Sequence, residues 1–271
     1  MLPLGATEEI LRRNNVRRSG DANARPIVFG HGFGCSQEVW RDVAPAFESD
    51  HDVITFDLVG AGGSDLSAYD RGKYDSLQGY ASDLVDLVEE LDLRDVVFVG
   101  HSVGAMIGVL AANRAPGRFG ALVLVGPSPR YTNIGDYVGG FEPADIQGLL
   151  DALDSNYLGW SATMAPVIMG NPDRPALGAE LTGSFCAVQP DIARHFAHVT
   201  FLSDNREDLP RVTVPTLVLQ CSEDVIAPEV VGRYVHASIP NSEYVELQAT
   251  GHCPNLSAPA ELTAAIRRYL G

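Results

Sequence analysis

The stretch Val96-Val-Phe-Val-Gly-His-Ser-Val-Gly104 decides the fold of this chain. An apolar, β-branched run ends abruptly at Gly100, and the small apolar residues from Ala105 to Ala112 have the composition of a helix. Ser102 therefore stands at the apex of a sharp strand-to-helix turn, and the glycines two residues before and after it remove side chains that would collide there. In this context G-x-S-x-G predicts a nucleophile elbow. The alternative is a turn whose serine only caps the helix.

Composition limits the classes of protein that this chain can belong to. With 271 residues, 45% of them hydrophobic and 20% charged, it can bury a large core in one α/β domain with an insertion. A net charge of −16 disfavours binding to nucleic acid or to anionic membranes. The four cysteines are scattered without a C-x-x-C pair, so we expect neither a disulfide framework nor a metal site, and no cofactor.

The N-terminus lacks a basic segment followed by an apolar core, and the sequence contains no run of eighteen apolar residues. We therefore expect a cytoplasmic protein without a secretion signal or a membrane span.

Strands and helices alternate over the first half of the chain. Short apolar runs at 26–29, 53–56, 96–99 and 121–125 read as strands, and the stripe of apolar residues between Leu77 and Leu91 reads as a helix. We also expect a helix from Glu38 to Phe47, and an initial hairpin in which Asn14-Asn15 joins residues 8–13 to residues 16–19. This alternation predicts a mostly parallel sheet flanked by helices, with ligands beyond the carboxyl ends of the strands.

The alternation stops after Val125. From Tyr131 to about Leu209 no strand is evident, and helical stretches are expected near 143–153, 155–169, 176–188 and 190–203. The strand pattern returns at Pro215. We therefore predict an α/β core formed by residues 1–130 and 210–271, with residues 131–209 inserted as a four-helix cap.

A serine nucleophile needs a base within hydrogen-bond reach and an acid that orients the base. Of the histidines after Ser102, His252 follows a predicted strand and so lies at the same edge of the sheet, whereas His195, His198 and His236 fall within predicted helices. The strand at 216–221 ends in Ser222-Glu223-Asp224. We expect Asp224, deeper in the loop, to be the acid, with Glu223 as the alternative.

The reaction also needs donors for an oxyanion. The N–H of Val103 follows the nucleophile at a helix N-terminus, and the N–H of Phe33 lies in the glycine-rich loop His31-Gly32-Phe33-Gly34 after an early strand. Cys35 and Cys253 stand close to these residues in sequence. We expect them to pack in the core, although an electropositive neighbour would make either thiol reactive. The acidic loop from Asp57 to Asp65 is interpreted as a structural turn.

With these residues in place, the chain resembles the α/β-hydrolase fold, and within it the RsbQ-like branch that includes the karrikin and strigolactone receptors of plants. The resemblance runs nearly from end to end. Besides the elbow, it rests on Gly30-His31-Gly32-Phe33-Gly34, Ser128-Pro129-Arg130-Tyr131 and Gly139-Gly140-Phe141-Glu142. The last two segments are more specific than the elbow, because most hydrolases of this fold lack them.

The resemblance implies a V-shaped cap of four helices over an apolar pocket. Ser102, Asp224 and His252 would form the triad, and the N–H groups of Phe33 and Val103 the oxyanion hole. Facing the ligand would be Phe33, Tyr131, Trp160, Met164 and Phe201. Gly104 and Met164 stand where the plant receptors tend to carry serine and phenylalanine, which favours the bacterial type. Bacterial members act in stress signalling beside a partner phosphatase.

We therefore predict a serine hydrolase that cleaves a small apolar ester or lactone. The alternative is a ligand-dependent signalling regulator that binds a protein partner and hydrolyses its ligand slowly or once. A perhydrolase or a hydrolase of C–C bonds without a cofactor would use the same triad.

Overall fold

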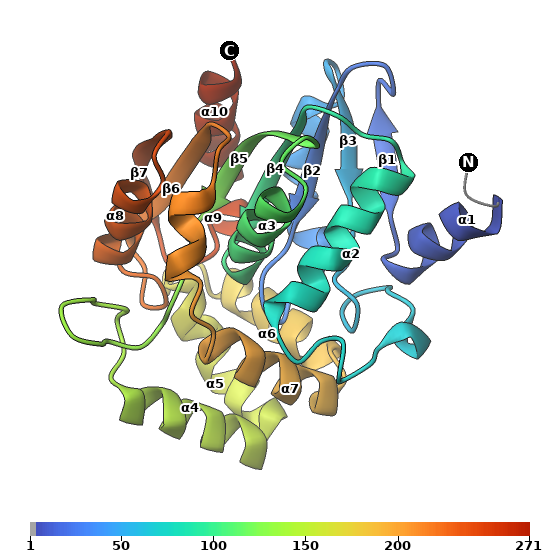
Figure 1. The fold of residues 1–271 in the computed structure, drawn as a ribbon. Coiled ribbons are helices and arrows are strands. Elements are labelled where there is room, and N and C mark those ends of the chain that lie inside the picture. The colour runs from blue at the N-terminus through green and yellow to red at the C-terminus, as the bar shows by residue number, and fades with distance from the viewer. Residues whose placement is uncertain (1–3) are drawn as a thin grey trace.

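The structure, a computed structural model, describes residues 4–271. Within this range the centre is a sheet of seven strands in the order β1-β3-β2-β4-β5-β6-β7 (Figure 1). Neighbouring strands are parallel, except that β1 pairs antiparallel with β3. The strands are β1 (Arg17–Gly20), β2 (Arg25–Gly30), β3 (His51–Thr55), β4 (Val96–His101), β5 (Phe119–Val125), β6 (Thr216–Glu223) and β7 (Ser242–Thr250).

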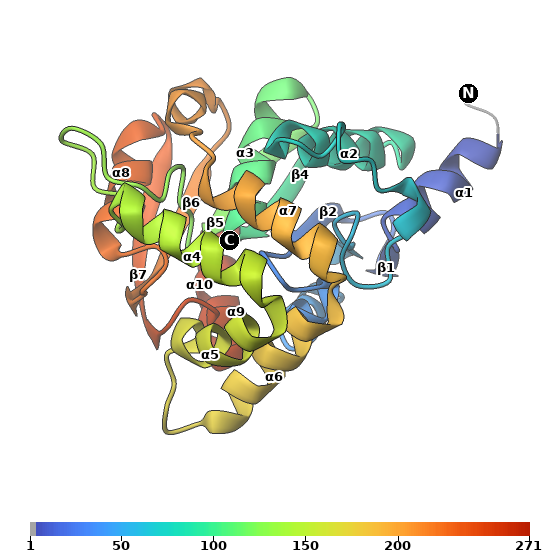
Figure 2. The ribbon, with the colours of Figure 1, turned by 90° about the horizontal axis from the view of Figure 1, so that it is seen from below.

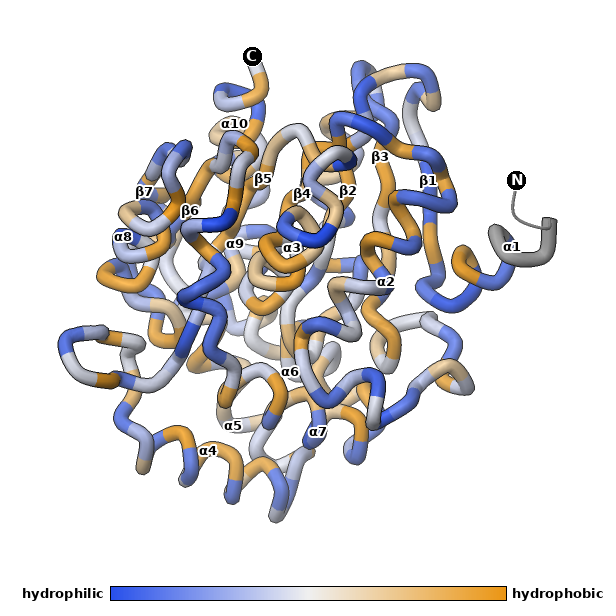
Figure 3. Tube along the Cα trace, viewed as in Figure 1, coloured by the Kyte–Doolittle hydropathy of each residue, from blue (hydrophilic) through white to orange (hydrophobic). Residues whose placement is uncertain are grey.

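Alternate side chains of the central strands supply two separate cores. In β4, Val96 and Phe98 pack with α2 (Leu77–Glu90), α3 (Val103–Arg114) and α8 (Glu229–Ser238) on one face of the sheet. Val97 and Val99 pack on the other face, where the short α9 (Pro254–Ser257) and α10 (Pro259–Leu270) lie. Hydrophobic residues accordingly concentrate along the central strands and α3 (Figure 3). A strand buried on both faces explains the unbroken apolar run in the sequence.

The register of the central strands brings three loops together. Gly30 of β2 pairs with Gly100 of β4, and His101 of β4 pairs with Val125 of β5. Because these strands are parallel and end at one level, the loops that follow them meet at the same edge of the sheet.

Four helices between β5 and β6 form an inserted cap at this edge: α4 (Pro143–Ser155), α5 (Tyr157–Met169), α6 (Pro175–Ala187) and α7 (Pro190–Phe201). Seen from below, α4 and α7 run across the ends of the strands, with α5 and α6 beside them (Figure 2). Three of these helices have proline in the first turn, where a missing N–H costs nothing, and this places the breaks between them. The predicted fold class is confirmed, cap included.

The predicted N-terminal hairpin is wrong, because its first arm is the helix α1 (Leu4–Arg13). Only the second arm is a strand, and it pairs with β3. Asn14 is fully buried and exchanges hydrogen bonds with Asp57 at the end of β3: its side-chain amide donates to the Asp57 carbonyl at 2.9 Å, and its own carbonyl accepts from the Asp57 N–H at 2.8 Å. The two asparagines therefore end a helix and join it to the sheet instead of closing a two-stranded turn.

The single helix expected from Glu38 to Phe47 is also wrong. The segment contains two 3₁₀ helices, η1 (Gln37–Trp40) and η2 (Ala44–Phe47), because Pro45 has no N–H with which to continue an α-helical ladder. The expected apolar face survives, since Trp40, Val43 and Phe47 are all buried. Two further 3₁₀ helices are η3 (Leu66–Ala68) and η4 (Arg206–Arg211). No helix among the described residues has the length and apolar character needed to cross a membrane.

Candidate active site

Ser102 occupies a strained turn between β4 and α3. Its backbone has φ 56° and ψ −124°, a conformation that residues other than glycine rarely adopt. A Cβ on Gly100 would lie 2.6 Å from the carbonyl oxygen of Gly104, so the turn can close only with glycine there. The N–H of Ser102 donates to the Val125 carbonyl at 2.8 Å, which fixes the turn to the end of β5. These contacts hold the serine at the carboxyl edge of the sheet.

His252 and Asp224 complete a hydrogen-bonded chain from this serine. His252 Nε2 lies 2.8 Å from Ser102 Oγ, and His252 Nδ1 lies 2.7 Å from Asp224 Oδ2. All three residues are more than nine-tenths buried. The second carboxylate oxygen of Asp224 accepts the N–H groups of Ile226 and Ala227, at 2.8 and 3.0 Å. An acceptor at Nδ1 favours the tautomer that leaves Nε2 free to receive the serine proton.

The acid is therefore Asp224 and not its neighbour. The side chain of Glu223 is exposed, and only its backbone carbonyl takes part, accepting the N–H of Gly251 at 2.6 Å. The other downstream histidines have different partners: His195 meets Tyr69, His198 meets Asp154, and His236 meets Ser242.

His101, beside the nucleophile, anchors the loop that carries His252. Its Nε2 donates to the backbone carbonyl of His252 at 2.7 Å, and the two rings lie 5.0 Å apart. Burial and the neighbouring His252 lower the pKa of His101 to about 3, so its ring stays neutral at physiological pH. A neutral ring adds no positive charge next to a histidine that must itself become cationic during the reaction.

The residues predicted to supply the oxyanion donors, Phe33 and Val103, lie in segments that adjoin Ser102. Val103 begins α3, so its N–H is among the first-turn donors that have no acceptor within the helix. Phe33 lies in the loop that follows β2, and a Cβ on neighbouring Gly32 would stand 3.1 Å from Ser102 Cβ. His31 supports this loop, because its Nε2 accepts the Leu58 N–H at 3.0 Å. Phe33 also lines the same cavity as Ser102, so both donor residues adjoin the nucleophile, and a tetrahedral oxyanion would require their N–H groups to point at it.

A small apolar cavity lies between Ser102 and the cap. Of the predicted pocket residues, Phe33, Tyr131 and Phe201 line it. The volume that is open to the centres of water molecules is about 30 Å³, little more than a single water needs. Burial raises the pKa of the Tyr131 phenol, which therefore stays protonated. The cavity lining also includes residues that sequence analysis did not assign to it: Ile168, Leu181, Phe185, Thr200 and Ile226.

The structure does not bring Met164 to this cavity. Met164 and Trp160 line a separate hollow between α4 and α5, beside Leu149 and Ala152. Met164 and Ile168 are one turn apart and so lie on nearly the same face of α5. Their separation along the helix axis decides the difference: Met164 lines the hollow beside α4, and Ile168, nearer the end of the helix, lines the Ser102 cavity. Trp160 lies behind the cavity wall: its ring centroid is 6.3 Å from that of Phe33, and it stacks on Phe185 at 6.0 Å.

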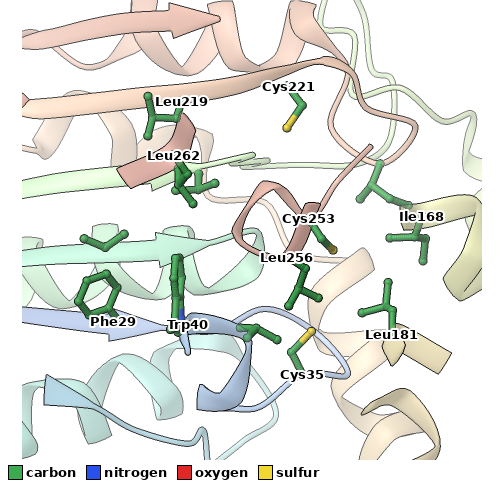
Figure 4. Close-up of a cluster of buried hydrophobic side chains, with 14 of the residues drawn as sticks. Phe29, Cys35, Trp40, Ile168, Leu181, Leu219, Cys221, Cys253, Leu256 and Leu262 are labelled. Atoms are coloured by element: carbon green, nitrogen blue, oxygen red, sulfur yellow. The ribbon is translucent and has the colours of Figure 1, made fainter. Parts of the chain in front are cut away.

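The cysteines near the site pack as ordinary core residues. Cys35 and Cys253 lie among the apolar side chains of Ile168, Leu181 and Leu256 (Figure 4). Burial raises the pKa of the Cys35 thiol to about 12 and that of Cys253 well above its usual value. Neither thiol is therefore ionised at neutral pH.

Asp57 has a structural role, as its turn-forming sequence predicts: it holds neighbouring loops together through hydrogen bonds. Its carboxylate accepts the N–H groups of Gln37 and Gly63 at 2.7 and 2.9 Å, and the side-chain amide of Asn15 at 2.7 Å. Within residues 4–271, no group of three or more His, Cys, Asp or Glu side chains is arranged to hold a metal ion.

Comparison with known proteins agrees with this geometry. The model of the alpha/beta hydrolase family matches residues 27–266. The chain belongs to the alpha/beta hydrolase family. It is 37% identical to a probable esterase of Oryza sativa subsp. japonica, over 98% of each chain, and 38% identical to a strigolactone esterase of Arabidopsis thaliana, over 96% of this chain and 97% of that one.

A solved structure also resembles this one closely. The hydrolase olei00960 from Oleispira antarctica superposes with a TM-score of 0.94 at 38% identity, over 97% of each chain. That hydrolase thus shares the whole architecture, cap included, with this protein.

Proposed function

We propose that this protein is a serine esterase or lactonase that acts on a small apolar substrate through an acyl-enzyme on Ser102. The observation that carries the proposal is the unbroken chain Ser102–His252–Asp224 at 2.8 and 2.7 Å, buried at the base of an apolar cavity. The relatives named as esterases support the same reaction class. The cap, residues 131–209, would select the substrate, and residues 1–130 and 210–271 would carry the chemistry.

The proposed reaction has two halves. Ser102 Oγ attacks the carbonyl carbon while His252 Nε2 takes the serine proton, and the N–H groups of Phe33 and Val103 stabilise the oxyanion. The intermediate collapses, and the alcohol leaves with the proton from His252. Water then attacks the acyl group, gives a proton to His252, and frees the carboxylic acid as that proton returns to Ser102. A lactone gives a single hydroxy acid. Asp224 stabilises the imidazolium in both halves.

Replacement of Ser102 by alanine tests this function. We expect Ser102→Ala to lower kcat/KM for p-nitrophenyl acetate by at least about 10³-fold, because the nucleophile is lost while the fold is kept. Ser222→Ala is the matched control, since Ser222 lies at the same edge of the sheet, is exposed, and bonds only to the backbone of β7. Turnover that survives in Ser102→Ala, or failure of a fluorophosphonate to label Ser102 in the unmodified protein, would contradict the proposal.

A second candidate is a ligand-dependent regulator of the kind found in the RsbQ-like branch, acting with a phosphatase-type protein partner. It is favoured by a relative over nearly the whole chain that is named as a receptor, the karrikin insensitive 2 receptor CA of Petunia hybrida, at 37% identity. Mass spectrometry of the protein after brief incubation with an ester distinguishes the enzyme from the regulator. A lasting acyl group on Ser102, released far more slowly than it forms, supports the regulator. Rapid turnover at a free Ser102 supports the enzyme.

A further inference from the structure

Two cavities meet at the side chain of Phe33. One is the cavity at Ser102, and the other lies towards Tyr80 and Phe196. Phe33 is the single residue that the two described linings share. The second cavity is small as well, with about 10 Å³ open to the centres of water molecules. The Phe33 ring is therefore a wall between two apolar spaces, neither of which is large by itself.

Aromatic rings hold this wall in place from both sides. On the Ser102 side, the Phe33 ring centroid lies 5.6 Å from that of Phe185 and 5.9 Å from that of Phe201. On the other side it stacks on Phe196 at 5.8 Å. These distances are typical of favourable ring pairs, so neighbouring rings support the Phe33 ring on both sides.

The second cavity is apolar and largely enclosed. Leu58, Val59, Tyr80 and Phe196 line it, and each is more than nine-tenths buried. An enclosed apolar end suits the alkyl or aryl end of an acyl group, which stays on the serine until water cleaves it. It does not suit the alcohol, which must leave for solvent before that step.

We propose that the side chain of Phe33 sets the acyl length that this protein accepts, by separating the Ser102 cavity from a second apolar subsite next to Phe196. The inference rests on the proposed esterase function and extends it. With Phe33 in place, the substrate is an ester or lactone with a short acyl group. Without the ring, the two cavities join. The added space would hold an acyl chain longer by about as many carbons as the ring contains.

The test compares p-nitrophenyl acetate with p-nitrophenyl hexanoate. Phe33→Ala keeps the backbone N–H that serves the oxyanion, and the readout is the ratio between two substrates, so the test does not require acetate turnover to stay unchanged. We expect the ratio of kcat/KM for hexanoate to that for acetate to rise at least about tenfold. Phe33→Leu, a milder change that carries the test if the alanine variant does not fold, should give a smaller rise. Adding Ala193→Leu to Phe33→Ala should reverse the gain, because Ala193 lines only the second cavity.

Trp160→Ala is the control. It removes a ring that also contacts Phe33, at 6.3 Å between centroids, but lines neither of the two cavities, so it should not admit the longer chain. An unchanged ratio in a folded Phe33 variant that a fluorophosphonate still labels overturns the proposal. An equal rise in Trp160→Ala also overturns it, since a general loosening of the packing around Phe33 would then be the cause. If the unmodified protein itself is neither labelled nor active, the proposed function fails and not this inference alone.

Discussion

The substitution Asp224→Asn tests how the triad controls the histidine tautomer. Asp224 Oδ1 accepts two backbone N–H groups, from Ile226 and Ala227, and Oδ2 faces His252 Nδ1 at 2.7 Å. In the asparagine variant, the amide oxygen must take the position of Oδ1, because those two buried donors need an acceptor. The amide NH₂ then faces His252 Nδ1 and can pair only with an unprotonated nitrogen.

That exchange inverts the tautomer of His252. The ring proton moves to Nε2 and points at Ser102 Oγ, so the histidine no longer accepts the serine proton. The lost carboxylate also no longer stabilises the imidazolium. We expect kcat to fall on the order of 10⁴-fold, which corresponds to about 5.5 kcal/mol of barrier, with little change in KM.

The assay is turnover of p-nitrophenyl acetate together with the rate of fluorophosphonate labelling. Both should fall in parallel, while the thermal midpoint stays near that of the unmodified protein, since the side chains are nearly isosteric. Glu223→Gln is the matched control and should retain activity within about threefold, because its carboxylate is exposed and has no part in the chain of hydrogen bonds. If Asp224→Asn keeps a tenth of the activity, or if Glu223→Gln loses as much, the assignment of the acid is refuted.

Two further predictions concern pH. The pKa of His101 is about 3 in the folded protein, below that of an unfolded histidine, so its contribution to stability is full above about pH 6.5 and falls on acidification. Thermal melts at pH 7 and 5 should show a loss that is about 2 kcal/mol smaller in His101→Gln, whose pH–rate profile keeps its shape. Burial also lowers the pKa of His31, which should account for part of the loss that remains. Arg206 and Arg130 lower the pKa of Asp204 to about 2, so Asp204→Asn should lower the free energy of unfolding in urea by about 1 kcal/mol at pH 7. This deficit should shrink below about pH 4, where the carboxylate is protonated in the unfolded chain. A deficit that stays constant with pH would argue against the ion pair.

Sequence alone predicted the elements whose signal is local. The buried strand before Gly100, the glycines around Ser102 and the helix after it form one continuous pattern, and the steric clash at Gly100 is set within five residues. The cap helices were predicted for the same reason, since proline and asparagine mark their beginnings. Local patterns failed at two places. At Asn14, hydrogen bonds to the distant Asp57 end a helix where a hairpin was expected, and at Pro45 the missing N–H leaves two 3₁₀ helices in place of one α-helix.

Sequence by itself determined the reaction class, because the elbow and the order Ser, Asp, His constrain chemistry through residue type and position along the chain. The size of the cavity was decided only by tertiary structure. Met164 lies one turn too far along α5 to reach the Ser102 cavity, which Ile168 lines instead, and Phe185 lines it from another helix. The physical reason is that a triad is specified by strand ends that meet at one edge of a parallel sheet, whereas a cavity is the space that packed helices leave, and that depends on the angle and depth of every contact.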